Sequence, residues 1–414
     1  MKIHPLLEAE KQARARRYER ERRLLGLAGT ALTAALLLAF FYSGVSVRLA
    51  SLFGASGSEA GPGLLARQAA AGSAGAVFPF FGPFIWTFLI YGIVFLAWMT
   101  VPGLPLGYYA EFVIERKWGF STQTLRGWLS DQVKGFAVGL VLGWLGLGLI
   151  IWVMVRFGAL WWLAAGLGMA LVSVVLASLA PVVIFPLFHR YKPISDETLT
   201  RGLADILDRE GLKSGGFFEE DMSRRTRKEN AFLAGLGRTR RVVLGDTLIR
   251  NMSAQEITAI VAHEVGHFRY RHIWKGIAAG TAEQLVVFFA VDGVMRAAFA
   301  TAFLASPRAN LALVPMMALV GGTTAGVVFG PLRHALSRRF EKRADLYAVA
   351  HVPDGRAFVT ALAGLANRNL ANAYPARWVK LLYYSHPPIG ERLAYAEERL
   401  AVSVFAQANV NINK

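Results

Sequence analysis

The sequence predicts an α-helical membrane protein that crosses the bilayer about six or seven times and carries a separate domain built from two polar segments. Hydrophobic residues make up 54% of the 414 residues and charged residues only 18%, whereas ordinary soluble domains have about a quarter charged residues. Two long segments, 189–274 and 336–414, are polar enough to fold outside the lipid. Five long runs contain no Asp, Glu, Lys or Arg: residues 24–47, 68–110, 135–155, 157–189 and 309–332.

The N-terminal segment, residues 1–23, is strongly basic. It holds eight Lys or Arg and four Glu, and the apolar run that follows has no small-residue cleavage pattern. This arrangement is typical of a retained amphipathic helix on the cytoplasmic surface, followed by a membrane anchor, and not of a cleaved signal peptide.

The membrane-spanning region is expected in two parts, residues 24–188 with four helices and residues 275–335 with two. A helix needs about 20 apolar residues to cross about 30 Å of hydrocarbon, so each charge-free run is long enough to span. The sixth candidate, residues 276–305, includes Glu283 and Asp292, and acidic groups at membrane depth normally face a protein interior or a wet cavity. Two explanations stay open: Asp292 forms a satisfied pair with Arg296 one turn away, or both acidic residues line an internal chamber.

The distribution of basic residues predicts the orientation. With a cytoplasmic N-terminus, all but five of the 45 Lys and Arg residues lie on the cytoplasmic side. The positive-inside rule then places both polar segments in the cytoplasm. The formal charge of +17 is explained by this topology, so no nucleic-acid partner is expected. The five basic residues on the outer side are Arg48, Arg67, Arg156, Arg296 and Arg308.

The first polar segment contains the pattern His-Glu-x-x-His at residues 263–267. On a helix, His263 and His267 project from one face and can share a Zn²⁺ ion, while Glu264 polarises the metal-bound water. The segment is expected to be helical because Ser253 and Glu256 form a capping-box pattern ahead of an apolar stripe. The chain has no cysteine, so any further metal ligand must be a nitrogen or oxygen donor.

A catalytic zinc takes three protein ligands and leaves a fourth position for water. One known variant places the third histidine six residues after the second, but that position is Ile273. The best candidate for the third ligand is Glu341, which shares a helical face with Asp345, and Asp345 can accept the free N–H of a ligand histidine. Alone, this stretch is typical of a salt-bridged solvated helix. The other histidines have no useful spacing and are interpreted as core or surface residues: His4, His189, His272, His334 and His351.

The combination resembles the integral-membrane zinc metallopeptidases of the CAAX prenyl endopeptidase 1 family. The similarity covers most of residues 80–400 and includes four further stretches. These are residues 112–125 after an early span, Asn230-Ala231-Phe232 leading into residues 241–248, residues 337–345 around the third ligand, and Ser385-His386-Pro387-Pro388 with Arg392. Two features depart from the family pattern: Phe232 stands where Tyr is expected, and residues 45–77 are short and polar where the second of the seven spans of eukaryotic members would lie.

The resemblance implies a gluzincin-type α+β peptidase domain, built from the two polar segments, and an intramembrane chamber walled by helices, which would explain Glu283 and Asp292. It implies that one Zn²⁺ ion is bound by three side chains and that Glu264 is the general base. The substrate backbone would add to an edge strand, and two basic side chains would stabilise the oxyanion. The implied residues are His263, His267 and Glu341 for zinc, Asn230, Ala231 and Phe232 for substrate, and His386 and Arg392 for the oxyanion.

The resemblance also implies the activity, a zinc metalloendopeptidase that acts on peptide or protein substrates at the lipid bilayer. The family's name reaction removes the C-terminal tripeptide of a prenylated CAAX sequence, but no residue here demands a prenyl group. A broader protease for quality control of membrane proteins therefore stays open. A six-helix transporter with Glu283 and Asp292 in its path, or an inactive scaffold, would belong to other classes, and zinc-dependent cleavage would exclude both.

Overall fold

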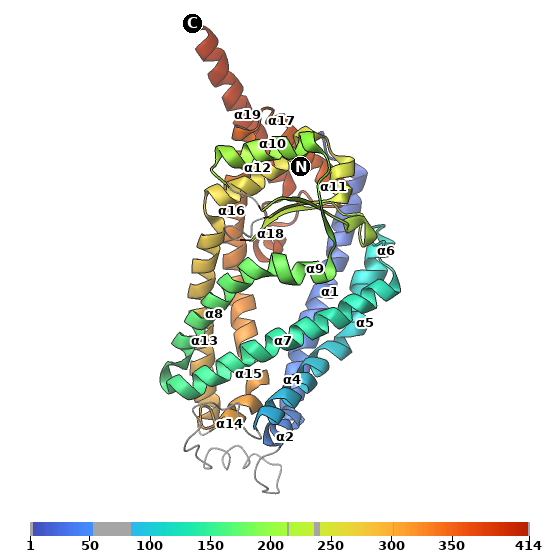
Figure 1. Cartoon of the computed structure of the whole chain (residues 1–414). Coiled ribbons are helices and arrows are strands. Elements are labelled where there is room, and N and C mark those ends of the chain that lie inside the picture. The colour runs from blue at the N-terminus through green and yellow to red at the C-terminus, as the bar shows by residue number, and fades with distance from the viewer. Residues whose placement is uncertain (1–2, 53–83, 213–214, 236–240, 301, 413–414) are drawn as a thin grey trace.

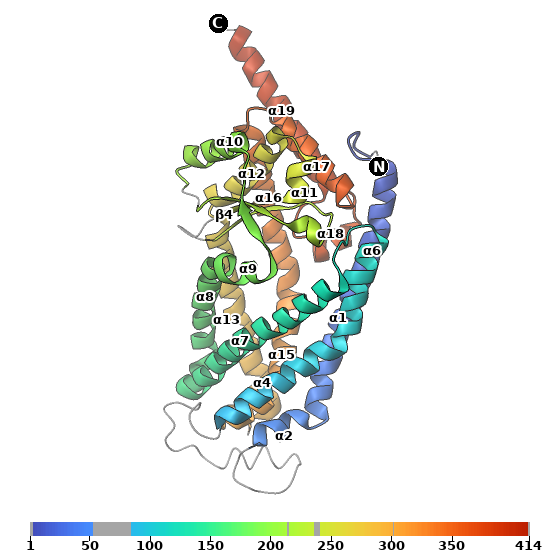
Figure 2. The same cartoon turned by 45° about the vertical axis from the view of Figure 1, so that its right-hand side comes forward.

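The computed structural model describes residues 3–52, 84–212, 215–235, 241–300 and 302–412. Long helices form an elongated bundle, and a small sheet with shorter helices covers one end of it (Figure 1). A view turned by 45° shows the same two parts, with the long first helix running along the bundle to that end (Figure 2). This is the mainly helical architecture that the sequence predicts.

Within the described residues, five helical stretches are long and apolar enough to cross a membrane: Ala9–Tyr42, Phe84–Lys117, Leu125–Phe188, His272–Phe299 and Val314–His351. The third has 64 residues and breaks at Gly158, whose φ of 51° is a backbone conformation that favours glycine. It divides there into α7 (Leu125–Phe157) and α8 (Trp161–Leu179), which pack against each other. The prediction of a multi-pass helical membrane protein is confirmed. Residues 53–83, which include the start of the predicted apolar run 68–110, lie outside the described residues.

One continuous stretch connects the membrane region to the polar domain. It runs from α15 (Val314–Thr323) through a π turn into α16 (Gly330–His351). Its first half is the predicted apolar run, and its second half contains Glu341 and Asp345. A helix that is continuous across the boundary holds these two carboxylates at a fixed height above the membrane part.

Three further long helices are α1 (Ala9–Tyr42), α4 (Phe84–Thr100) and α13 (His272–Phe299). The other helices are short or lie in the polar domain. They are α2 (Val45–Ser51), α5 (Leu104–Gly107), α6 (Glu115–Lys117), α9 (Phe185–Phe188), α10 (Glu197–Arg209), α11 (Asp246–Asn251), α12 (Ala254–Arg269), α14 (Pro307–Ala312), α17 (Arg356–Arg368), α18 (Arg377–Tyr383) and α19 (Ile389–Ile412).

The basic N-terminal stretch is the first half of α1 and not a separate surface helix. Its polar side chains contact the C-terminal part of the chain: Gln12 Nε2 donates to the carbonyl of Ala371 at 3.2 Å. Asn372 Nδ2 donates to Glu19 Oε2 at 2.5 Å. These contacts fix the basic half of α1 against the polar domain, while the apolar half continues among the membrane helices.

A four-stranded sheet lies in the polar domain, in the order β1 (Tyr191–Pro193), β2 (Phe217–Glu220), β4 (Arg241–Gly245) and β3 (Ala231–Ala234). Strands β2 and β4 are parallel and the other neighbours are antiparallel. The central strand β4 is apolar because both of its faces are covered. Strand β3 is at the edge of the sheet, so one side of its backbone has no partner strand among the described residues.

The polar domain has one hydrophobic core that joins the two polar segments. Helix α12 packs against α10 on one side and against α16 and α17 on the other, and the shared core includes Leu203, Val261, Tyr347, Phe358 and Leu393. Burial of this shared apolar surface holds the two segments together, although two membrane helices separate them in the sequence.

Asp292 is buried inside the helical bundle with both carboxylate oxygens occupied. Trp161 Nε1 donates to one oxygen at 2.6 Å, and Arg296 Nε donates to the other at 2.8 Å. Of the two explanations left open for this residue, the geometry supports the satisfied pair, extended by a tryptophan from α8. The interpretation of Asp292 as a chamber-lining residue is therefore corrected: its carboxylate links two helices.

Candidate metal centre and active site

Two helices bring three potential metal ligands together. Helix α12 presents His263 and His267 from one face, and α16 presents Glu341 opposite them. The ligand atoms all lie within 4.8 Å of one another. The two Nε2 atoms are 3.1 Å apart, and each lies 3.3 Å from an oxygen of Glu341.

The sequence explains why α12 is helical and why it approaches α16 so closely. The predicted capping box is present, since Ser253 and Glu256 exchange hydrogen bonds of 3.3 and 3.0 Å at the first turn. Gly266 lies against α16: a Cβ atom there would be 3.0 Å from Ala344 Cα and 3.1 Å from Tyr347 Cβ. Only a residue without a side chain allows the two helices to meet at this distance.

The donor set fits a bound divalent cation. Two imidazole nitrogens and a carboxylate, with no thiolate, are a usual combination for catalytic zinc. The Oε2 atom of Glu341 is buried and lies 3.3 Å from His263 Nε2, so the two atoms face each other as two ligands of one cation would. Burial opposes protonation of His263, but the nearby carboxylates of Asp345 and Glu341 raise its pKa to about 10. The same field favours a cation.

Asp345 supports the ligand His263 from behind. Its side chain is fully buried, and Oδ1 lies 2.8 Å from His263 Nδ1. Arg392 donates to both oxygens of Asp345, at 2.8 and 2.5 Å, and Tyr395 Oη donates to Oδ2. The contact between His263 and Asp345 is the one that the four-residue spacing predicted.

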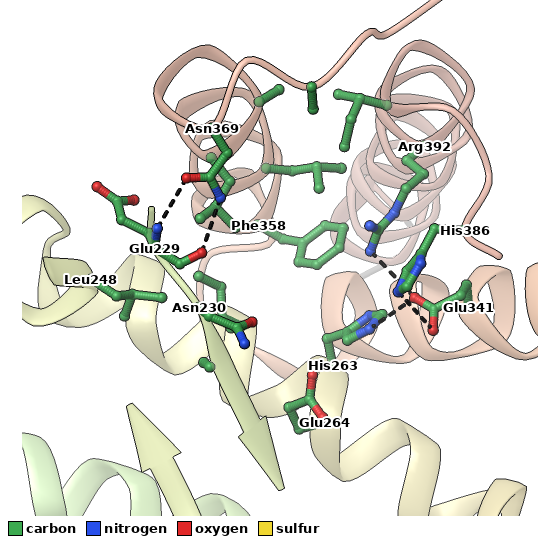
Figure 3. A pocket seen from close by; sticks show the side chains of 17 residues that line it. Glu229, Asn230, Leu248, His263, Glu264, Glu341, Phe358, Asn369, His386 and Arg392 are labelled. Carbon is green, nitrogen blue, oxygen red and sulfur yellow. Dashed lines mark hydrogen bonds and ion pairs between the residues drawn. The ribbon is translucent and has the colours of Figure 1, made fainter. Parts of the chain in front are cut away.

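Glu264 and the edge strand face the same space. A pocket of about 280 Å³ is lined by Asn230, Ala231, His263, Glu264 and His386, with Arg392 at its far side (Figure 3). Burial raises the pKa of Glu264, so this carboxylate accepts a proton more readily than an exposed glutamate does. The rest of the pocket wall combines three polar residues, Glu229, Glu341 and Asn369, with an apolar group, namely Leu248, Ile260, Phe358, Leu362, Leu365, Ala366, Ala371 and Ile389.

A second and larger cavity, of about 890 Å³, shares Ala231, His263, Glu264, Glu341 and His386 with the smaller pocket. It extends from His263, Glu264 and His267 between α13 and α16, and most of its wall is apolar. Glu283 lies in this wall and forms an ion pair with Arg333 across the two helices. Asp292 is not among the residues that line it. Phe232 lines this cavity too and packs edge to face on Phe185.

The two residues predicted to stabilise the oxyanion differ in their surroundings. His386 is half exposed, and its Nε2 atom lies 3.3 Å from Glu341 Oε1. Arg392 is buried and directs two of its donors to Asp345, so neutralising that carboxylate is its evident structural task. Both residues line the smaller pocket. Their role toward an oxyanion stays a prediction.

Two residues at this site were not found from the sequence. Asn369 donates to the carbonyl of Glu229 and accepts from its N–H, each at 3.0 Å, and so holds the chain just before the edge strand (Figure 3). His272, interpreted above as a core or surface residue, lies with its Nδ1 atom 3.0 Å from Nδ1 of His267. The only signal for His272 was its position five residues after His267, which is not a helical-face spacing.

Comparison with known proteins agrees with this geometry. Residues 2–190 match the family model for the N-terminal region of CAAX prenyl proteases, described as five membrane helices. Residues 193–400 match the model for peptidase family M48. The chain is similar to the uncharacterized metalloprotease YhfN of Bacillus subtilis, with 29% identity over 302 residues, 72% of this chain and 70% of the relative.

Two further relatives extend the comparison. CAAX prenyl protease 1 of Saccharomyces cerevisiae is 29% identical over 312 residues, 71% of this chain and 68% of the relative. Among solved structures, Ste24p of S. mikatae superposes with a TM-score of 0.73 at 24% identity, over 95% of this chain and 91% of the other. At that identity the superposition shows a shared fold.

Proposed function

The chain belongs to peptidase family M48, whose model matches residues 193–400, and from this premise we propose that it is a zinc endopeptidase of the membrane that cleaves prenylated or other membrane-associated peptides near their C-terminus. The observation that carries the proposal is the convergence of His263, His267 and Glu341 beside Glu264, where a mixed polar and apolar pocket meets a larger apolar cavity next to the edge strand β3.

We assign the metal to the two histidines of α12 and the glutamate of α16, with Zn²⁺ as the ion that this donor set favours. Zinc bound there would supply Lewis acidity, both for the attacking water and for the scissile carbonyl. The chain itself provides the geometry: Asp345 orients His263 through Nδ1, and Gly266 lets Glu341 approach.

Glu264 is the general base. It faces the smaller pocket together with the ligand His263, and its raised pKa suits a group that takes a proton and then returns it. In the proposed reaction Glu264 removes the proton of the attacking water and passes it to the nitrogen of the departing amine. His386, at the opposite side of the pocket, would donate to the carbonyl oxygen as negative charge develops there.

The free edge of β3 gives the substrate its direction. A peptide that pairs antiparallel with this strand places its C-terminal end toward Asn230 and its N-terminal end toward Leu233. Asn230 belongs to the wall of the smaller pocket and Leu233 to the wall of the larger cavity. The residue after the scissile bond would therefore enter the 280 Å³ pocket, and the residue before it would point into the 890 Å³ cavity.

Apolar side chains in both spaces support a CAAX-type substrate. The smaller pocket, lined by side chains such as Leu248 and Leu362, suits an aliphatic residue after the cleaved bond. The larger cavity lies between two membrane helices and suits an apolar chain attached to the residue before that bond. A transporter would need neither the metal ligands nor the strand edge.

We also propose the orientation and the domain division that the sequence predicts. Residues 189–274 and 336–414 would form one cytoplasmic catalytic domain, attached to membrane helices within residues 24–188 and 275–335. The support is the distribution of basic residues, of which all but five fall on the proposed cytoplasmic side.

The test uses the purified chain in lipid with a farnesylated peptide that ends in Cys, two aliphatic residues and a final residue, beside its unmodified twin. We expect release of the C-terminal tripeptide from the farnesylated peptide, loss of cleavage with a chelator, and recovery with zinc. Equal cleavage of the two peptides would favour the quality-control protease. If the zinc-loaded chain cleaves neither these peptides nor an unfolded membrane protein, the proposed function is wrong.

A further inference from the structure

A buried histidine outside the proposed ligand set contacts the metal centre. His272 is the first residue of α13 and is only 5% exposed. Its Nδ1 atom lies 3.0 Å from Nδ1 of His267, and the two rings meet edge to face with centroids 5.0 Å apart. The proposed reaction uses no atom of His272.

The position of the proton on each ring follows from the orientation of the His267 ring. Its Nε2 atom points to His263 Nε2 and Glu341 Oε1, so in a neutral ligand the proton is on Nδ1. Among the described residues, the acceptor in contact with that N–H is Nδ1 of His272, 3.0 Å away, which must then carry its own proton on Nε2. We infer that His272 is a positioning residue that accepts the Nδ1 proton of His267 and thereby fixes the orientation and basicity of this metal ligand.

The ring of His272 is held in place by its neighbours. It stacks on Phe340 with centroids 4.2 Å apart and an interplanar angle of 10°, and Tyr270 stacks on it at 5.7 Å. Arg271, with a φ of 54°, forms the sharp turn that brings the start of α13 back toward α12. Phe340 directly precedes Glu341 in α16. The same turn of this helix therefore positions the proposed ligand Glu341 and, through Phe340, the ring of His272.

A packing role alone does not explain a histidine at this position. Its Nε2 atom is buried without a hydrogen-bond partner among the described residues, and such an atom is costly. An apolar ring would fill the same space without that cost. The polar ring is understandable if its other nitrogen is needed by His267.

The two ligand histidines therefore have different supports. His263 has a carboxylate, Asp345, which Arg392 neutralises, whereas His267 has a neutral imidazole. A neutral acceptor orients the ring without adding a further negative charge to a site that already contains Glu341 and Glu264. Loss of such a partner typically weakens metal binding by about 10-fold to 100-fold.

This inference rests on the proposed metal site, and the experiment separates the two. Zinc affinity is measured by competition with a chromophoric chelator, using the whole chain in detergent. The wild type is compared with three variants of His272 and one control variant. His272→Phe keeps the stacked ring and removes the acceptor. His272→Asn and His272→Leu both remove the ring, have similar shapes, and differ in the acceptor. His351→Phe is the matched control, because His351 also stacks on a tyrosine but lies outside the site.

We expect His272→Phe to bind zinc at least about 10-fold more weakly than the wild type, and His351→Phe to bind it equally well. We expect His272→Asn to bind zinc clearly more tightly than His272→Leu, a comparison that stands even if His272→Phe does not fold. Equal affinities of His272→Asn and His272→Leu, or wild-type affinity in His272→Phe, would overturn the role of His272.

A further variant, Glu341→Gln, tests the site itself. If the wild type binds one zinc ion and Glu341→Gln does not, the metal site stands whatever the result for His272. If the wild type binds no zinc, or Glu341→Gln binds it equally well, the proposed metal site is wrong and the inference about His272 falls with it.

Discussion

Replacing Gly266 with alanine tests whether the close contact between α12 and α16 builds the metal site. An added Cβ would lie 3.0 Å from Ala344 Cα and 3.1 Å from Tyr347 Cβ, whereas carbon atoms in contact prefer about 3.5–4.0 Å. Both neighbouring atoms belong to or adjoin the backbone of α16 and cannot rotate away. The helices must therefore separate by about 0.5 Å.

The expected cost follows from two opposing terms. Overpacking of a tight contact costs about 1–3 kcal/mol, and alanine is better than glycine within a helix by about 1 kcal/mol. The net loss of stability is therefore about 0–2 kcal/mol, which the domain should survive. The metal site is more sensitive, because functional side chains must lie within about 0.5 Å of their productive positions, and the expected separation of the helices is of that size. We expect zinc affinity and peptide cleavage each to fall by at least about 10-fold.

The matched control is Gly202→Ala in α10, where no heavy atom lies within 4 Å of the added Cβ. This variant should be as stable as the wild type or slightly more stable, with unchanged zinc affinity. Chelator competition gives the affinity, thermal unfolding gives the stability, and the farnesylated peptide gives the activity. If Gly266→Ala binds zinc and cleaves the peptide like Gly202→Ala, the close helix contact does not determine the site.

Three further predictions concern single side chains. Glu264→Gln should bind zinc normally yet cleave about 100-fold to 10,000-fold more slowly, because it removes the proton acceptor; single-turnover cleavage at the wild-type rate would contradict the assigned role. Asp345→Asn should weaken zinc binding by about 10-fold or more and lower the melting temperature, because it leaves Arg392 buried with less compensation; chelator competition and thermal unfolding measure both effects. Asn369→Ala should raise KM more than it lowers kcat, because it releases the backbone of Glu229 ahead of the edge strand; an unchanged KM would show that this anchor does not affect substrate binding.

The membrane region was largely predictable because its signal is local. A run such as residues 135–155 is apolar on every face, and any helix with that composition is stable only in lipid or in a core. Asp292 shows the limit of predictions made from local sequence. Its partner Arg296 was visible one turn away, but Trp161 lies 131 positions earlier in the chain, and nothing in either segment encodes that contact.

The candidate active site also has a part that the sequence predicts and a part that it does not. The spacing of His263, Glu264 and His267 and the capping box at Ser253 belong to one helix, so sequence alone predicted that the two histidines share a face. The same four-residue spacing related Glu341 to Asp345. Such relations can be predicted because helical geometry is fixed by the backbone and does not depend on the rest of the fold.

Only the tertiary structure decided how the helices meet. His272 reaches His267 because the chain reverses at Arg271, and a turn has no periodicity that would place a side chain on a neighbouring face. Arg392 meets Asp345, and two cavities adjoin His263 and Glu341, because the packing of the whole domain determines which helix faces approach each other. Sequence determined the chemistry that each element carries, whereas the contacts between elements, which depend on the volume and shape of many side chains at once, determined which groups act together.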